Sequence, residues 1–178
     1  MDEGFTVAPA GRSDIPAIRR IEADPRYEGL VGRWSAAQHR AEMALASSRY
    51  FRLRGADGEV AGFALLQGFD DPDRKVHLKR IAVREPGAGL GSVLLRAVLD
   101  RVYAETEVNR IDLDVFVGND RARRAYEKAG FKVEGVLRDY HRDGDGSFSD
   151  MWLMSVLRRD WERVARGSPV SRRTGGRR

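Results

Sequence analysis

The chain has 178 residues, 42% of them hydrophobic and 33% charged, which suits one domain with its own core. It contains no cysteine, so disulfides, thiolate metal sites and a cysteine nucleophile are excluded. No apolar run approaches the roughly eighteen residues of a membrane span, and the acidic start Met-Asp-Glu-Gly is unlike a secretory signal. We therefore expect a cytoplasmic protein that does not enter a membrane.

The net charge of +5 is concentrated at the C-terminal end. Between Arg158 and Arg178 there are eight arginines and two acids, a net charge of +6, so subtraction leaves −1 for residues 1–157. Residues 167–178 are small and polar, which predicts a disordered basic tail after a domain over residues 1–166. Such a tail is either a solvated end or a weak electrostatic contact for nucleic acid.

The first third of the chain predicts one strand and two helices. Residues 5–10 have strand composition. Asp14 is expected to cap a helix over residues 15–23, in which isoleucines recur at helical spacing. Ser35 is expected to cap a second helix over residues 36–46.

The middle of the chain predicts three strands and a long helix. Residues 49–69 contain two strands joined at the turn Ala56-Asp57-Gly58, a strong hairpin signal. The alternating segment 75–85 is a further strand. It runs into "PGAGLGSVLL" (86–95), which opens an apolar helix over about residues 90–106.

The last third predicts a strand, a helix and a hairpin. Residues 110–117 alternate as a strand, and Asn119 is placed to cap a helix that Gly130 ends. Two closing strands flank the turn at residues 143–146. The predicted fold is therefore a single-domain mixed α/β sheet of order βααβββαβαββ, flanked by helices.

The glycine segment predicts a phosphate site. A strand followed by Gly87-x-Gly89-x-Gly91 and a helix presents free amide groups at the positive end of a helix dipole. Such an arrangement can hold a phosphate or a diphosphate. A nucleoside triphosphate is disfavoured, because Gly91 is followed by Ser92 and Val93 without the lysine of a P-loop.

A dinucleotide is a closer alternative. Gly87, Gly89 and Ser92 nearly fit G-x-G-x-x-G, and Asp112 or Asp114 lies about twenty residues downstream, where a ribose-binding acid belongs. However, a dinucleotide fold usually opens with this unit and repeats it. Here a three-strand meander precedes the unit, and one helix and a hairpin follow it.

The third candidate is coenzyme A, and here the chain resembles a known family. "PGAGLGSVLL" resembles the acetyl-CoA loop of the GNAT superfamily of N-acetyltransferases, Gln/Arg-x-x-Gly-x-Gly/Ala, with Pro86 at the position where Gln or Arg is usual. The ending "EGVLRDYHRDGDGSFSDMWLM" resembles the branch of ribosomal-protein N-terminal and spermidine acetyltransferases. The family's second signature is matched at Asn119, Ala122, Tyr126, Lys128, Gly130 and Phe131.

The resemblance implies an acetyl-CoA site and a role for each matched residue. The exposed backbone of Ile81, Ala82 and Val83 would lie along the pantetheine arm, and the side chains of Ile81 and Val83 can belong to the core as well. Asn119 would contact that arm and also cap its helix. The remaining cofactor-binding residues implied are Gly87, Gly89, Leu90, Gly91, Ser92, Ala122, Tyr126 and Lys128.

Acyl transfer from a thioester to an amine needs a neutral amine, a polarised carbonyl and a protonated leaving group. Strand amides can polarise the carbonyl, and Tyr126, a phenol that is neutral near pH 7, can protonate the sulfur; its ring can also be core filler. The base is left open. His77 titrates in the right range, Asp112 and Asp114 share one strand face, and water can relay the proton.

The sequence therefore predicts an acetyl-CoA-dependent N-acetyltransferase that uses direct attack in a ternary complex, because no nucleophile for a covalent intermediate is evident. The alternative is a non-catalytic CoA-binding or nucleic-acid-associated module of the same fold. No metal is expected. The acceptor is a small-molecule or peptide amine, which residues 24–38 and the last hairpin would select, and a homodimer is possible.

Overall fold

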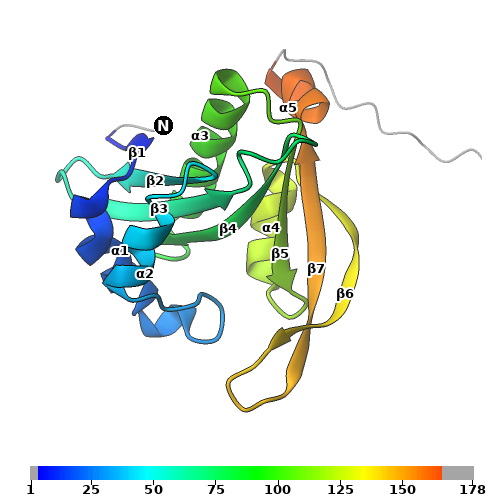
Figure 1. The fold of residues 1–178 in the computed structure, drawn as a ribbon, viewed down its shortest axis with the longest axis horizontal. Helices are drawn as coiled ribbons and strands as arrows, with labels where there is room; N and C mark the ends of the chain where they lie inside the picture. Colours follow the sequence, from blue (N-terminus) through cyan, green and yellow to red (C-terminus); the bar gives the residue numbers. More distant parts are fainter. Residues whose placement is uncertain (1–3, 166–178) are drawn as a thin grey trace, which may run out of the picture.

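Seven strands form one mixed sheet in the computed structural model, which describes residues 4–165 (Figure 1). The sheet order is β1-β2-β3-β4-β5-β7-β6. The strands are β1 (Thr6–Pro9), β2 (Ser48–Arg54), β3 (Val60–Gln67), β4 (Lys75–Val83), β5 (Arg110–Phe116), β6 (Lys132–Arg142) and β7 (Phe148–Leu157). The helices are α1 (Ile15–Glu22), α2 (Ala36–Glu42), α3 (Leu90–Glu105), α4 (Asp120–Lys128) and α5 (Arg158–Ala165), with 3-10 turns η1 (Arg12–Asp14) and η2 (Pro25–Tyr27).

The predicted order of strands and helices is confirmed, with three local differences. Asp14 is the N-cap residue of α1, as predicted, but its carboxylate forms no capping hydrogen bond with that helix; it accepts the amide of Gly11 and closes the preceding turn η1. Helix α2 ends at Glu42 rather than near residue 46. Helix α5 was not predicted, because arginines dominate that segment; residues 167–178 lie outside the described residues.

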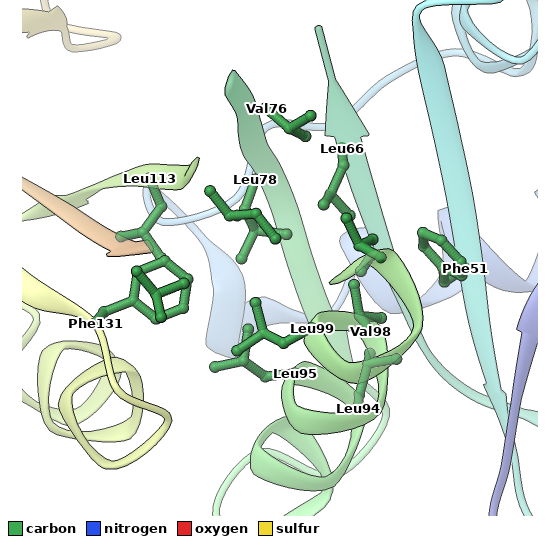
Figure 2. Packing of buried hydrophobic residues seen from close by; sticks show 14 of the residues in the cluster. Phe51, Leu66, Val76, Leu78, Leu94, Leu95, Val98, Leu99, Leu113 and Phe131 are labelled. Carbon is green, nitrogen blue, oxygen red and sulfur yellow. The ribbon is translucent and has the colours of Figure 1, made fainter. Parts of the chain in front are cut away.

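Helices cover both faces of the sheet. Helices α1 and α2 lie on one face, and α3 and α4 lie on the other (Figure 1). The larger core lies between α3 and the sheet, where Leu94, Leu95, Val98 and Leu99 of the helix meet side chains of four strands (Figure 2). A smaller core around Ile18, Phe63 and Leu65 lies on the α1 face. Burial of these apolar side chains is the main source of stability.

Strands β4 and β5 are parallel and pair only over their first residues. The register joins Lys75 to Arg110, Val76 to Ile111 and His77 to Asp112, and then stops. On its other edge β4 has a bulge, because Lys79 has no partner between the pairs Leu66–Leu78 and Leu65–Arg80. A bulge bends and twists its strand. The two strands therefore separate beyond His77 (Figure 1), and the sheet opens into a V.

No helix within residues 4–165 is both long enough and apolar enough to cross a membrane.

Candidate active site

A cavity of about 380 Å³ lies between the end of β4, the glycine loop and α4. Strand β4 contributes Ile81, Ala82 and Val83, and the loop contributes glycines and Ser92. The wall from α4 includes Ala122, Tyr126 and Lys128. The remaining lining residues are Tyr27, Pro86, Gly87, Gly89, Gly91, Leu95, Arg121, Arg124 and Ala125.

The glycine loop brings its backbone to the cavity surface. Gly87 and Gly89 have φ values of +100° and +85°, a region that favours glycine. An added Cβ at either position would meet no atom within 4 Å, so the space beside the backbone is open. Gly89 also begins α3, whose first-turn amides face no helical carbonyl. The loop therefore offers amide donors at the positive end of α3.

Three cations line the same cavity from α4. Arg121, Arg124 and Lys128 are spaced three and four residues apart, so they lie on one helix face. All three are exposed and form no ion pair among the described residues. Together with the loop amides they give this cavity a positively charged lining that suits a ligand with several phosphate charges.

The free edge of β4 is partly occupied by Tyr27. Its hydroxyl donates to the Val83 carbonyl at 2.9 Å and accepts from the Val83 amide at 2.8 Å. The Arg84 amide donates to the carbonyl of Ala61 in β3. Along a strand, the N–H and C=O groups of successive residues point alternately to the two edges, so those of Ala82 face β3 as well. The peptide groups of Ile81 consequently face the cavity.

A second cavity, of about 260 Å³, opens on the other side of Tyr126. It lies inside the V, between β4, β5, the α1–α2 connection and the β6–β7 hairpin. Five residues line both cavities: Tyr27, Ile81, Arg121, Ala122 and Tyr126. A ligand held along β4 would therefore meet a second ligand held in the V at Tyr126.

Tyr126 is kept in its neutral form. Burial, together with the carboxylate of Asp114 nearby, raises the pKa of the Tyr126 phenol. Its ring packs against Phe131 with centroids 5.8 Å apart, so its orientation is fixed by the core. A half-buried neutral phenol between two cavities can donate a proton to an atom that develops negative charge.

His77 lies at the apex of the V and is clamped between two carboxylates. Its Nδ1 is 2.9 Å from Asp112 Oδ1, and its Nε2 is 3.1 Å from Asp114 Oδ1. Burial alone would lower the pKa of His77, but hydrogen bonds to Asp112 and Asp114 raise this pKa to about 9. An imidazolium with both nitrogens engaged has no lone pair for a proton, so this geometry favours a positioning role for His77, which is one of several candidates for the base predicted from sequence.

A buried polar network joins β4 to the α1–α2 connection. Glu22, 1% exposed, accepts hydrogen bonds from Arg80 at 2.6 Å, from His39 at 3.1 Å and from the Trp34 amide at 3.2 Å. The Arg80 guanidinium also lies 4.0 Å above the Trp34 ring. Charged groups this deeply buried need such partners. The network fixes one wall of the second cavity.

The structure gathers most of the predicted residues in these two cavities. Leu90 differs, because its side chain is buried in the core and only its main chain reaches the loop. Asn119 caps α4 by accepting the Ala122 amide at 3.2 Å, and it lines the second cavity rather than the first. Sequence reasoning missed Tyr27 and the pair Arg121 and Arg124. The helical spacing of these arginines with Lys128 was the available signal.

Comparison with known proteins places this geometry in a family. Residues 15–131 match the Acetyltransferase (GNAT) family. L-amino acid N-acetyltransferase AaaT of Escherichia coli (strain K12) is 29% identical over 161 residues, covering 86% of this chain and 98% of the relative. YdaF of Bacillus subtilis (strain 168) is 31% identical over 107 residues, covering 60% of this chain and 58% of the relative.

Solved structures show the same fold. Spermidine N-acetyltransferase from Vibrio cholerae in complex with CoA and spermine superposes with a TM-score of 0.80 at 19% identity, over 90% of this chain and 99% of that one. The chain therefore belongs to the GNAT family of acetyltransferases. It is an acetyl-CoA-dependent N-acetyltransferase, as its sequence predicts, and nothing favours the non-catalytic alternative.

Proposed function

We propose that acetyl-CoA binds in the cavity beside β4, that the amine acceptor binds in the V, and that Tyr126 serves both. The residues fit the cofactor, which supplies an acetyl thioester. The loop amides around Gly89, with Arg121, Arg124 and Lys128, suit its phosphates. The outward peptide groups of Ile81 suit the amide-rich pantetheine arm.

Chemistry in this arrangement is a direct transfer. The Ile81 amide polarises the acetyl carbonyl as negative charge develops on its oxygen. The amine nitrogen forms the new bond to the acetyl carbon, and the bond from that carbon to sulfur breaks. Tyr126 gives its proton to the departing sulfur, and the proton that the acetylated nitrogen then loses restores the phenol.

Asp114 is the proposed receiver of the incoming ammonium group. It contributes the one carboxylate among the residues that line the second cavity. Burial alone would raise the pKa of Asp114, but the hydrogen bond with His77 lowers this pKa, so the carboxylate stays charged. It holds the ammonium group until the proton leaves to water. His77 fixes Asp114 and Asp112 at the apex, as a positioning residue.

The shared position of Tyr126 carries this proposal, and a single substitution tests it. Tyr126→Phe should lower kcat by roughly ten- to a thousandfold, within the range of general acids. Acetyl-CoA affinity, measured by calorimetry, should stay within about threefold, because the ring and its packing are retained. Tyr103→Phe removes the hydroxyl of a buried tyrosine outside both cavities and is the matched control. Unchanged turnover in Tyr126→Phe would remove this residue from the chemistry.

A homodimer through the outer strand β6 is proposed as well. This strand ends the sheet, and exposed apolar side chains lie along its hairpin at Val133, Val136, Tyr140 and Phe148. Unpaired strand edges with apolar side chains favour association. One solved neighbour is described as a dodecameric spermidine N-acetyltransferase from Vibrio cholerae. Light scattering should give twice the monomer mass, and Val136→Lys should give the monomer.

A further inference from the structure

The charges around the second cavity limit what can enter it. Asp114, whose Oδ1 also lies 3.1 Å from His77 Nε2, is its one carboxylate, whereas Lys79, Arg80 and Arg121 are cations. Arg80 is already paired with buried Glu22. Lys79 and Arg121 form no ion pair among the described residues. The cavity therefore has a place for one ammonium group and repels a second positive charge.

Apolar side chains form part of the remaining surface of this cavity. Leu30 and Val31 come from the α1–α2 connection, and Val115 and Phe116 come from β5. Leu30 stays 40% exposed although it is a large apolar side chain. Such a side chain at a cavity mouth is available to cover an apolar part of a ligand.

An irregularity in β6 completes the apolar wall. The pairing of β6 with β7 breaks between Leu137 and His141, and Asp139 has a φ of +51°, unusual for a residue other than glycine. Its amide donates to the carboxylate of Asp150 at 2.8 Å, which holds this conformation. The kink aims His141 at β5, where its ring stands edge-on to Phe116 with centroids 5.0 Å apart. Bulges commonly re-aim a side chain beside an active site.

We infer that the acceptor is a primary amine with a single positive charge beside an apolar or aromatic group. The inference rests on the proposed function, since it assigns the V to the acceptor. Asp114 would hold the ammonium group near Tyr126, while Leu30, Phe116 and His141 would cover the apolar group. Polyamines and aminoglycosides fit poorly, because their further ammonium groups would meet Lys79, the cation of this cavity that is paired neither with Glu22 nor with the phosphates of the cofactor.

Acetyl-transfer kinetics with defined amines test this inference. Thiol release is measured with phenethylamine, spermidine and kanamycin. We expect kcat/KM for phenethylamine to exceed that for either polycation by about tenfold or more, because the cavity covers an apolar group and repels a further positive charge. Equal or better turnover of spermidine or kanamycin would overturn the inference, and so would absence of phenethylamine turnover.

A matched pair of variants tests the location. Leu30→Glu adds a carboxylate in the cavity and should lower the ratio of phenethylamine to spermidine kcat/KM by about tenfold. Leu45→Glu introduces the same change at a site 51% exposed and outside the cavity, and it should leave the ratio unchanged. Equal ratios in the two variants would place the acceptor elsewhere.

Calorimetry of acetyl-CoA on the same preparations separates the two hypotheses. If the wild-type protein did not bind acetyl-CoA, the proposed function itself would be contradicted. Intact binding together with Tyr126-dependent acetylation of spermidine alone would contradict only the acceptor class.

Discussion

The hydroxyl of Tyr27 forms hydrogen bonds with both main-chain polar groups of Val83, at 2.9 Å to the carbonyl and 2.8 Å to the amide. It replaces the strand neighbour that β4 loses when the sheet opens. A sheet can separate only where the freed peptide groups find other partners. Tyr27 is the partner of the Val83 peptide groups, and the peptide groups of Ile81 remain available to a ligand.

Tyr27→Phe should therefore destabilise the protein without changing the shape of the ring. Tyr27 is 7% exposed, so the substitution leaves two buried peptide groups unpaired. We expect the free energy of unfolding in urea to fall by about 1–3 kcal/mol. In the control Tyr140→Phe the change should stay within about 0.5 kcal/mol. Equal stability of Tyr27→Phe and the wild type would show that these bonds contribute nothing.

Removing the charge of Glu22 should be more costly. Glu22→Gln leaves the Arg80 guanidinium without its buried carboxylate partner, and the free energy of unfolding should fall by about 3–5 kcal/mol. Glu28→Gln changes an exposed residue of the same type on the same connection, and its effect should be about 0.5 kcal/mol or less. A small effect at both positions would mean that Arg80 finds water or another partner.

The His77 clamp gives stability a defined pH dependence. The folded pKa of about 9 lies above that of a free imidazole, so protonated His77 stabilises the fold. This contribution is fully present below about pH 6.5 and is lost as the pH rises through about 9. In urea unfolding, the difference between wild type and His77→Gln should shrink from pH 6 to pH 10. A constant difference over this range would contradict the clamp.

The sequence predicted the order of strands and helices because each one carries its own local signal. The Ser35 cap and the turn at Gly58 are examples, and both are present in the structure. Helix α5 was missed because its segment, in which three of eight residues are arginines, carries little apolar periodicity of its own. In the structure Trp161 packs on the Tyr103 ring with centroids 5.3 Å apart, a contact that local pattern does not reveal.

The candidate site could be predicted only where its residues belong to sequence motifs with fixed spacing. The glycine loop, Asn119 and Tyr126 lie in motifs with fixed spacing. The partners of His77 could not be predicted, because the register that places Asp112 opposite it links strands 35 residues apart. The burial of Glu22 against Arg80 could not be predicted either, because these two residues lie 58 positions apart in the chain.

Calorimetric titration of acetyl-CoA into the wild type and Gly89→Glu tests the central assignment of the cofactor cavity. Gly89 faces open space at the mouth of α3, so a glutamate there would fill the phosphate site and repel the diphosphate. Gly58→Glu has a similar positive φ and open space on the remote β2–β3 turn, and it controls for backbone strain. We predict affinity at least about 100-fold weaker for Gly89→Glu and within about threefold of wild type for Gly58→Glu. Wild-type affinity in Gly89→Glu would contradict the assignment.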